Sequence, residues 1–221
     1  MGETFSHNSQ SSHPSHSALA PTSPGVYLNS MEDPIALFKS WLEEAKATDL
    51  REPTAMSVAT VNADGNPEVR MLLLKGVDEH GFVFYTNLGS PKAKSIQAHP
   101  HVALCFYWMP LGKQVRVTGP VVPVSDQEAD EYFASRPRLS QLGAWASRQS
   151  QEMGGYYELE AEVAKVALKF GVGKVPRPPF WSGFRLVPEA IEFWTEKPFR
   201  RHERFVFRKT PEGWSRHWLF P

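Results

Sequence analysis

The sequence predicts a mainly β protein with helices (α+β), organised as an antiparallel barrel and not as a doubly wound parallel sheet. Segments rich in β-branched and aromatic residues recur along the chain, turn sequences join several of them directly, and few helical segments separate them. With 221 residues, the chain is long enough for one domain with a sizeable core, or for a compact core with extensions. We find no internal repeat.

The first element expected is an amphipathic helix. Asp33 can cap it, Pro34 suits its first position, and apolar residues follow at helical spacing as far as Ala45. The preceding residues, 1–30, are rich in Ser, His, Pro and Asn, so they cannot bury enough apolar surface to offset the entropy of ordering them. We therefore expect a flexible arm over residues 1–30 and one domain over residues 31–221.

Five strands are expected in the first half of this domain, at Ala55–Val61, Glu68–Lys75, Phe82–Thr86, His101–Trp108 and Gln114–Val122. Turn residues at 62–65 and 78–81 predict hairpins between the first three strands. Ser90 and Pro91 can open a short helix that continues through Ala98.

Helices and then strands are expected in the second half. Ser125 and Glu128 have the spacing of a capping box, which predicts a helix, and further helical segments are expected around Leu139–Arg148 and Gly155–Phe170. Four strands follow, at Gly183–Val187, Ala190–Trp194, Arg204–Arg208 and Trp214–Leu219.

Charge and cysteine content exclude several classes of function. Lys and Arg number 24, as do Asp and Glu, so no overall charge directs the protein to nucleic acid or to an anionic membrane. Cys105 is the only cysteine, which excludes an internal disulfide, and its apolar strand pattern predicts a buried structural thiol. No apolar run approaches the roughly 20 residues of a membrane span, and the N-terminus lacks the apolar core of a secretory signal. We expect a cytoplasmic protein with no nucleic-acid or membrane partner.

Common nucleotide and metal motifs are absent. There is no G-x-G-x-x-G after a strand, no Walker P-loop and no H-E-x-x-H, and no metal site is expected. Instead, basic, hydroxyl and amide residues gather at the ends of expected strands and in connections. Four groups contain them: Arg70–Lys75; Tyr85–Asn87 with Ser90–Lys92; Tyr132–Ser150; and Ile191–Trp194 with Arg200–Arg204. For the last group, a solvated charged edge is the alternative.

Phosphate binding is the chemistry that the second and third groups suggest, although spacing alone leaves alternatives open. Basic residues bracket the apolar strand Arg70–Lys75, where ordinary solvated strand ends are the alternative. Lys92 in the first turn of a helix opposes the helix dipole; a bound phosphate would explain it, and a merely exposed lysine is the alternative. Tyr132 and Arg136 share a helix face, with Ser140 beyond, and arginine can hold a phosphate through two hydrogen bonds.

Together and in this order, the four groups resemble the pyridoxine (pyridoxamine) 5'-phosphate oxidase family over about Met31–Pro221. The most specific stretches are RMLLLK at Arg70–Lys75, VFYTNLGS at Val83–Ser90, SRPRLSQLGAWASRQS at Ser135–Ser150, and IEFW with RRHER at Ile191–Arg204. The resemblance implies an antiparallel Greek-key split β-barrel that binds FMN. It also implies a homodimer with two FMN sites formed between the subunits.

The resemblance further implies roles for individual residues. FMN contacts are implied for Arg70, Met71, Leu72, Leu73, Leu74, Lys75, Tyr85, Thr86, Lys92, Gln114, Gln149, Ser150, Trp194 and Arg204. The substrate phosphate would contact Lys75, Tyr132, Arg136 and Ser140, while Arg200 and His202 would lie over the pyridine ring and the carbon that is oxidised. His202 is expected to bind and orient the substrate and not to act as an obligatory base.

The implied reaction is the oxidation of pyridoxine 5'-phosphate and pyridoxamine 5'-phosphate to pyridoxal 5'-phosphate. A hydride passes from C4′ to flavin N5, and O₂ then reoxidises the flavin and gives hydrogen peroxide. The alternatives are a related flavin oxidase of the phenazine-pathway type, a non-catalytic FMN-binding protein, and a structural barrel without a ligand.

The chain departs from the family pattern at three positions. Pro91 stands where the family usually has an arginine that holds the FMN phosphate, so weaker FMN binding is expected. Arg201 adds a charge within the RRHER run. Trp218 replaces an arginine near the C-terminus, and the sequence offers no functional interpretation of that change.

Overall fold

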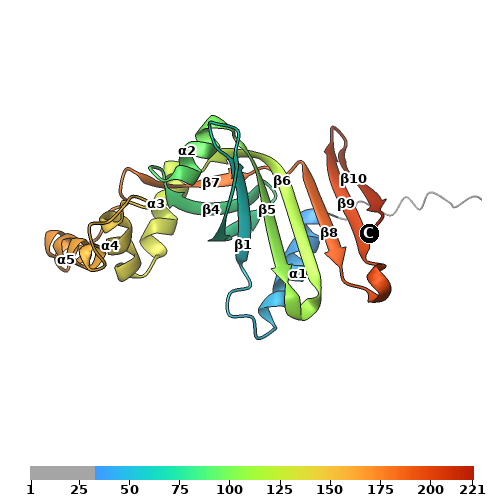
Figure 1. The fold of residues 1–221 in the computed structure, drawn as a ribbon, viewed down its shortest axis with the longest axis horizontal. Helices are drawn as coiled ribbons and strands as arrows, with labels where there is room; N and C mark the ends of the chain where they lie inside the picture. The colour runs from blue at the N-terminus through green and yellow to red at the C-terminus, as the bar shows by residue number, and fades with distance from the viewer. Residues whose placement is uncertain (1–32) are drawn as a thin grey trace, which may run out of the picture. The chain divides into compact units, whose positions relative to one another are not determined.

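The computed structural model describes residues 33–221, so the arm expected at residues 1–30 lies outside the described residues. In this part of the chain, ten strands pair with one another, and five α-helices and two 3₁₀ turns lie between them (Figure 1). All the strand pairs are antiparallel. The expected α+β fold with an antiparallel sheet is therefore confirmed.

Every helix and strand expected from residue 33 onward is present, with ends shifted by a few residues. The helices are α1 (Pro34–Lys46), α2 (Pro91–Ala98), α3 (Asp126–Ser135), α4 (Arg138–Ala146) and α5 (Glu158–Phe170), and the 3₁₀ turns are η1 (Met109–Leu111) and η2 (Pro198–Arg200). The strands are β1 (Ala55–Val61), β2 (Pro67–Leu73), β3 (Gly76–Asp78), β4 (Gly81–Asn87), β5 (His101–Trp108), β6 (Lys113–Pro123), β7 (Trp181–Leu186), β8 (Ala190–Thr195), β9 (Glu203–Thr210) and β10 (Gly213–Leu219).

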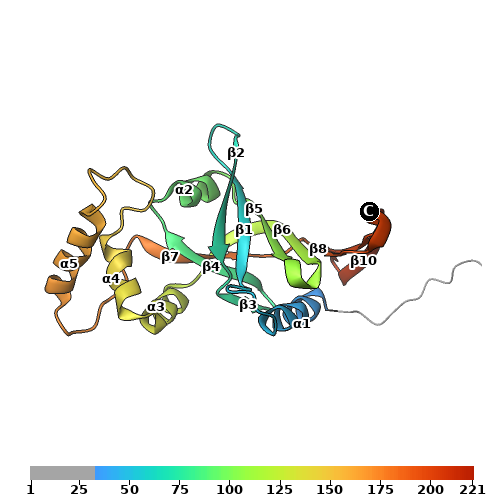
Figure 2. The ribbon, with the colours of Figure 1, turned by 60° about the horizontal axis from the view of Figure 1, so that its bottom comes forward.

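The sheet curls at β6 into a half-barrel (Figure 2). Its main path runs β10-β9-β8-β6-β5-β1-β2, while β3, β4 and β7 form a branch that returns to β6. Strand β6 pairs with β8 over residues 113–118 and with β7 over residues 121–123. Gly119 lies between these pairings, and a Cβ there would lie 2.1 Å from the carbonyl oxygen of Val187. Only glycine allows this close approach of two backbones.

Helix α1 covers the inner face of the curled sheet. Strand β1 buries alternate residues, as a strand with one face on a core must. Phe38 of α1 is fully buried, and its ring makes edge contacts with Phe82 and Phe106, with centroids 4.8 and 4.9 Å apart. Truncation of such a ring to Ala costs about 3–5 kcal/mol. Asp33 caps the helix as expected, since its Oδ1 accepts from the Ile35 N–H.

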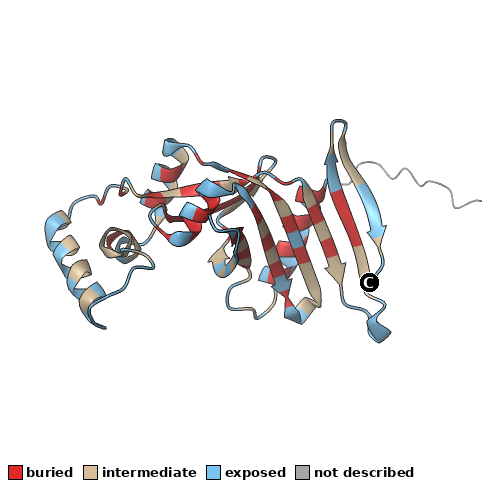
Figure 3. Cartoon of the chain, turned by 45° about the horizontal axis from the view of Figure 1, so that its top comes forward, coloured by how far each residue is buried: buried red, intermediate tan, exposed pale blue. Residues whose placement is uncertain are grey.

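A second apolar cluster attaches α3, α4 and α5 to the start of β7. Phe133, Leu142, Val175 and Trp181 are buried there, and partly buried residues of α5 pack against them. No residue of α5 itself is fully buried, and Figure 3 accordingly shows this helix in the colours of exposed and intermediate residues. The cluster matters for function because it fixes α3 and α4 beside the ends of β4 and β7.

The segment after β2 differs from expectation. The strand ends at Leu73 and not at Lys75, because Leu74 N–H donates to the Thr54 carbonyl and Lys75 N–H donates to the Val83 carbonyl. The chain thereby turns into β3, a three-residue strand that was not expected and of which only Asp78 falls in an expected turn. Lys75 consequently lies in a connection, where it is exposed.

Two further expectations are only half met. Ser125 Oγ accepts from the Glu128 N–H, as a capping box requires, but the Glu128 carboxylate accepts hydrogen bonds from Arg185 and does not return to Ser125. The expectation that Cys105 is buried is wrong. Its side chain lies on the outer face of β5 with intermediate exposure, and partial burial raises the pKa of the thiol.

Candidate functional site

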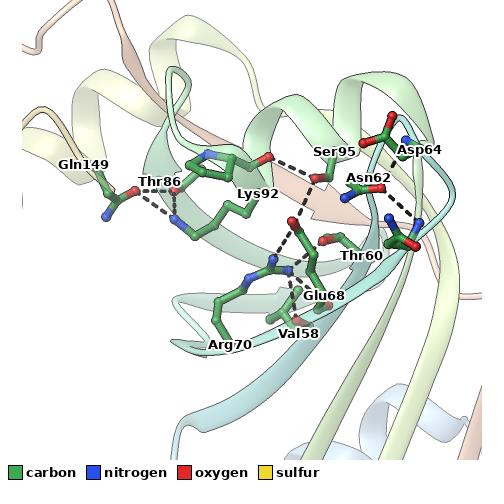
Figure 4. Close-up of polar contacts among 12 residues, drawn as sticks. Val58, Thr60, Asn62, Asp64, Glu68, Arg70, Thr86, Lys92, Ser95 and Gln149 are labelled. Atoms are coloured by element: carbon green, nitrogen blue, oxygen red, sulfur yellow. Dashed lines mark hydrogen bonds and ion pairs between the residues drawn. The ribbon is translucent and has the colours of Figure 1, made fainter. Parts of the chain in front are cut away.

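Lys92 lies in the first turn of α2 and is only 8% exposed. Its Nζ donates to Thr86 Oγ1 at 3.2 Å and to Gln149 Oε1 at 2.8 Å (Figure 4). Both acceptors are neutral, and no carboxylate within residues 33–221 pairs with Lys92. Burial, together with the nearby charge of Arg70, lowers the pKa of the ammonium group. The alternative of a merely exposed lysine is therefore wrong, and a bound anion would stabilise this cation.

The start of α2 offers fewer N–H groups than an ordinary helix. Ser90 is the N-cap, and Pro91 in the first turn has no N–H to donate. Ser90 Oγ donates to the Asn87 carbonyl and makes no capping hydrogen bond. An anion at this helix end therefore depends more on the side chain of Lys92 than it would at a helix with all its N–H groups.

Arg70 provides a second cation close to Lys92. Its Nη1 donates to Thr60 Oγ1 at 2.7 Å and to the Val58 carbonyl at 3.2 Å, and its Nη2 donates to Glu68 Oε2 at 3.0 Å. These contacts fix the guanidinium against β1 and β2. The alternative of an ordinary solvated strand end is therefore wrong for Arg70, whose side chain is 21% exposed.

A cavity of about 390 Å³ is lined in part by Thr86 and Gln149, the two side chains that accept hydrogen bonds from Lys92. Seven of its lining residues were expected at the site: Lys75, Tyr85, Thr86, Tyr132, Arg136, Ser140 and Gln149. Five were not: Asn87, Gly143, Ala144, Ser147 and Trp181. The volume falls within the range of small-molecule sites, and the lining combines aromatic rings with a few polar groups, as such sites do.

Arg136 is the less exposed of the two cations that line this cavity, the other being Lys75. Its Nη1 is buried and has no hydrogen-bond partner among the described residues. The guanidinium lies over the ring of Trp181, 4.8 Å from the centroid, and burial lowers its pKa. A buried donor without a partner costs about 1–3 kcal/mol, which an anion in the cavity would offset by accepting its hydrogen bond.

Three parallel rings form a wall beside Arg136. Tyr85 stacks on Tyr132 at 4.0 Å between centroids and on Trp181 at 5.2 Å, with interplanar angles of 14° and 4°. Gly183, which pairs with Tyr85 across β4 and β7, makes room for the stack, since a Cβ there would lie 2.7 Å from the Tyr85 ring. Burial is the main cause that raises the pKa of Tyr85 to about 12. The phenol therefore remains protonated at neutral pH.

Three other expected residues lie on β8, just before β9 and on β9: Trp194, His202 and Arg204. The rings of Trp194 and His202 lie 4.7 Å apart, and His202 Nδ1 accepts from the Lys197 N–H at 3.2 Å. The proton of a neutral His202 ring must then reside on Nε2. Arg204 donates through Nε and Nη2 to Glu192 Oε1, at 3.1 and 2.8 Å.

Backbone strain occurs at or next to two expected site residues, Ser150 and Arg200. Only three non-glycine residues in the described part of the chain have positive φ: Ser150 at 68°, Phe199 at 60° and Arg200 at 59°. Two are expected site residues and the third precedes one of them. Such conformations cost of order 1–3 kcal/mol each and cluster at functional sites.

The structure separates the expected residues into two groups within one chain. The first group lies in or beside the cavity and consists of Lys75, Tyr85, Thr86, Lys92, Tyr132, Arg136, Ser140 and Gln149. The second group consists of Gln114 on β6, Trp194 on β8, Arg200 and His202 in the connection between β8 and β9, and Arg204 on β9. Figures 1 and 2 both show α3 and α4 at one end of the sheet and β8, β9 and β10 at the other. Of the others, Leu72 and Leu74 pack in the core, Leu73 lines a neighbouring cavity with Lys75, and Met71 is exposed.

Two family models match the chain, one described as pyridoxamine 5'-phosphate oxidase over residues 42–170, and one as the pyridoxine 5'-phosphate oxidase C-terminal dimerisation region over residues 181–221. The chain belongs to the pyridoxamine 5'-phosphate oxidase family. The resemblance inferred from the four residue groups is thereby confirmed. The second match covers β7–β10, so this part of the chain corresponds to the dimerisation region of the oxidase family.

Relatives in this oxidase family are similar in sequence to this chain over most or all of their own length. Proteins named pyridoxine/pyridoxamine 5'-phosphate oxidase from Caulobacter vibrioides and Rhodospirillum rubrum are 56% and 55% identical. The aligned region covers 88% of this chain in both comparisons, with 87% of the Caulobacter protein and 100% of the Rhodospirillum protein.

Solved structures of the same oxidase fold are also similar. PhzG from Burkholderia lata 383, in complex with tetrahydrophenazine-1-carboxylic acid, has a TM-score of 0.80 at 32% identity, covering 86% of this chain and 93% of that one. A pyridoxamine 5'-phosphate oxidase-related, FMN-binding protein from Nostoc punctiforme has a TM-score of 0.70 at 18% identity, covering 87% and 100%. The split-barrel flavoprotein fold expected from the sequence is therefore confirmed.

Residues 33–221 contain neither a membrane-spanning helix nor a cluster of metal-binding side chains. None of the helices there is long and apolar enough to cross a membrane. The same residues contain no group of three or more His, Cys, Asp or Glu side chains able to hold a metal ion.

Proposed function

We propose that this protein oxidises pyridoxine 5'-phosphate and pyridoxamine 5'-phosphate to pyridoxal 5'-phosphate, with FMN as cofactor and O₂ as the final acceptor. The observation that carries the proposal is the unpaired, buried Nη1 of Arg136 in a cavity lined by aromatic rings. This is the arrangement that a small aromatic molecule with an anionic group would complete. The names of the relatives at 55–56% identity support the same activity.

The residues near α2 suit the phosphate of FMN. Lys92 is a buried cation with only neutral acceptors, and Arg70 lies close enough to lower its pKa. Gln149, whose Oε1 accepts from Lys92, would also bind there. FMN and the substrate would thus each have a phosphate position of their own, at Lys92 and at Arg136.

The cavity residues suit the substrate phosphate. Arg136 would donate through its free Nη1, while Tyr132 and Ser140, which line the same cavity, would donate their hydroxyl hydrogens. Lys75 would add a mobile ammonium group from the connection after β2. Because Trp181 lies against the guanidinium, that group is already oriented before the substrate binds.

The separation of the two residue groups supports a homodimer. Arg200 and His202 lie between β8 and β9, and Figure 1 shows these strands at the end of the sheet opposite α3 and α4, which contribute residues to the cavity of Arg136. A second copy would bring its β8–β9 end to this cavity, and the match to a dimerisation region supports that arrangement. We propose residues 31–221 as the oxidase domain that forms this dimer.

The outer face of the sheet is the surface that such a second copy would cover. Val69 and Met71 of β2 are 70% and 61% exposed, and Tyr107 of β5 is 54% exposed. Strand register places Met71 opposite Ser57, which is opposite Cys105, so these apolar side chains share one face. Clustered exposed apolar side chains mark protein interfaces.

When bound, FMN supplies the acceptor for the hydride that leaves C4′ of the substrate, and O₂ then takes up the electrons to give hydrogen peroxide. The chain's own residues orient the reactants and hold charge. His202 would donate from Nε2, because its Nδ1 is occupied by the Lys197 N–H. Arg200 would balance charge next to the carbon that is oxidised.

An anaerobic absorbance experiment tests this function. Purified protein is loaded with FMN, oxygen is removed, and pyridoxine 5'-phosphate or pyridoxamine 5'-phosphate is added. We expect the flavin absorbance to bleach and to return with air, with one equivalent of pyridoxal 5'-phosphate formed. Bound flavin that stays oxidised with both compounds would refute the substrate assignment and favour a phenazine-type oxidase or a non-catalytic FMN-binding protein. A protein that binds no flavin would refute the cofactor assignment.

A further inference from the structure

Glu68 lies beside the two cations assigned to the FMN phosphate. Its Oε2 accepts from Arg70 Nη2 at 3.0 Å and from Ser95 Oγ of α2 at 3.1 Å. Figure 4 shows its carboxylate between the Arg70 guanidinium and Ser95. Glu68 therefore links strand β2 to the helix whose first turn contains Lys92.

The charges at this position are unequal. Arg70 and Lys92 contribute two positive charges, and among the described residues Glu68 is the only carboxylate that bonds to either of them. Any anion that binds to Arg70 must therefore approach the negative charge of Glu68 as well. Pro91 contributes neither a charged side chain nor an N–H to offset that repulsion.

Glu68 is not required to keep Arg70 in place. Arg70 Nη1 also donates to Thr60 Oγ1 at 2.7 Å and to the Val58 carbonyl at 3.2 Å. A neutral amide at position 68 would still offer an oxygen to Arg70 and Ser95. Replacement of the carboxylate would thus remove charge while preserving the hydrogen-bonded geometry.

We propose that Glu68 is a specificity-determining residue that weakens binding of the FMN phosphate and so narrows the preference of the site for FMN over riboflavin. The inference rests on the proposed flavin site. Its physical basis is the repulsion between a carboxylate and a phosphate that share one guanidinium partner. The residue acts on affinity through charge, and its effect must vanish for a flavin that has no phosphate.

The test is the equilibrium binding of FMN and of riboflavin to the full-length apoprotein, followed by quenching of flavin fluorescence. In E68Q, we expect the Kd for FMN to fall about 3- to 30-fold, the size of one partly screened charge–charge interaction. The Kd for riboflavin should change by less than about twofold, because riboflavin has no phosphate for Glu68 to repel. The dependence of the FMN Kd on salt concentration should become steeper, because the local positive charge increases.

Three further variants make the result specific. E43Q removes the same charge from the exposed face of α1, where Glu43 pairs with Lys46, and should leave both constants unchanged. E68D keeps the charge and should not tighten FMN binding. Glu68→Thr is a second neutral variant that suits a strand, so the test does not depend on the folding of one protein. Melting temperatures of the apoproteins report on folding.

Three outcomes overturn the inference. If FMN binds E68Q and Glu68→Thr no more tightly than the parent, Glu68 does not oppose the phosphate. If riboflavin gains as much affinity as FMN, the effect is not one of charge against phosphate. If the parent protein binds neither flavin, the proposed flavin site is refuted, and this inference with it. If the parent binds FMN and the neutral variants bind it with the same affinity, this inference alone is refuted.

Discussion

Replacement of Lys92 by methionine should weaken FMN binding while stabilising the ligand-free protein. Lys92 is 8% exposed, and its ammonium group bonds only to Thr86 Oγ1 and Gln149 Oε1. Its pKa is lowered by burial, so the folded state disfavours the charged form. In K92M neither acceptor is left alone, because Thr86 Oγ1 already donates to Gln149 Oε1 at 3.1 Å. Methionine also fills the space of the lysine stem.

The magnitude of the FMN effect follows from one lost charge-assisted contact. Such a hydrogen bond contributes about 1.5–3 kcal/mol, which corresponds to a Kd about 10- to 150-fold higher. The melting temperature of the apoprotein should rise, and the further rise on addition of FMN should shrink, since ligand stabilisation follows the ratio of ligand concentration to Kd.

The pH dependence provides an independent check on the cause. Because the folded-state pKa of Lys92 lies below its ordinary value of 10.5, the unfolded state binds more protons between the two values, and stability rises with pH in that window. The stability advantage of K92M over the parent should therefore be full below the folded-state pKa of Lys92 and should shrink as the pH approaches 10.5.

Differential scanning fluorimetry of the apoproteins and fluorescence titration with FMN provide the measurements. K94M, which removes an exposed lysine from the same helix, is the matched control and should change neither quantity much. A lower melting temperature for the K92M apoprotein would show that Lys92 stabilises the fold, and unchanged FMN affinity would show that it does not meet the phosphate. Either result refutes the reasoning.

Three other substitutions test the cavity and the second residue group. R136K should raise the KM for pyridoxine 5'-phosphate about 10- to 100-fold with a smaller change in kcat, because lysine lacks the planar guanidinium that lies over Trp181. An unchanged KM in steady-state kinetics would exclude Arg136 from the phosphate site. G183A should lower the melting temperature by the equivalent of about 1–3 kcal/mol and raise the KM for pyridoxine 5'-phosphate, since its Cβ would lie 2.7 Å from the Tyr85 ring. The control is G155A, whose Cβ would meet nothing within 4 Å. Equal effects in both variants would contradict the steric cause. H202N should raise the KM more than it lowers kcat, and a collapse of kcat alone would show that His202 acts as an obligatory base.

The elements of the fold were largely predictable from local patterns. Asp33 and Pro34 predicted α1, and alternating apolar residues predicted the strands, because capping and burial on one face depend on residues that are close in sequence. Strand β3 and the turn η2 were not predictable in this way. Both are three residues long and depend on hydrogen bonds or backbone angles imposed by distant segments, such as the Lys75 N–H to the Val83 carbonyl.

The candidate site was predictable only where its residues follow one another in the chain. The position of Lys92 against the helix dipole pointed to an anion, but its burial depends on β4 and on Gln149, which is 57 residues away. Trp181 was missed because it joins the cavity through the pairing of β7 with β4, a contact that no local pattern records. For the same reason, Glu68 gave no signal in the sequence, since its importance lies in contacts to Arg70 and Ser95 together.

The way each cation is compensated distinguishes structural from binding roles. Arg177 and Arg185 each pair with two carboxylates, Asp126 and Asp130 for the first, and Asp78 and Glu128 for the second, and these pairs join loops to helices and strands. Lys92 and Arg136 have no carboxylate partner within residues 33–221 and bond instead to neutral acceptors or aromatic faces. A buried cation without a counter-ion destabilises a fold, and ligands that supply the missing charge would explain such cations at both proposed phosphate positions. Arg70 is intermediate, because one carboxylate already neutralises it, and that is why the charge of Glu68 should limit how tightly a phosphate can bind.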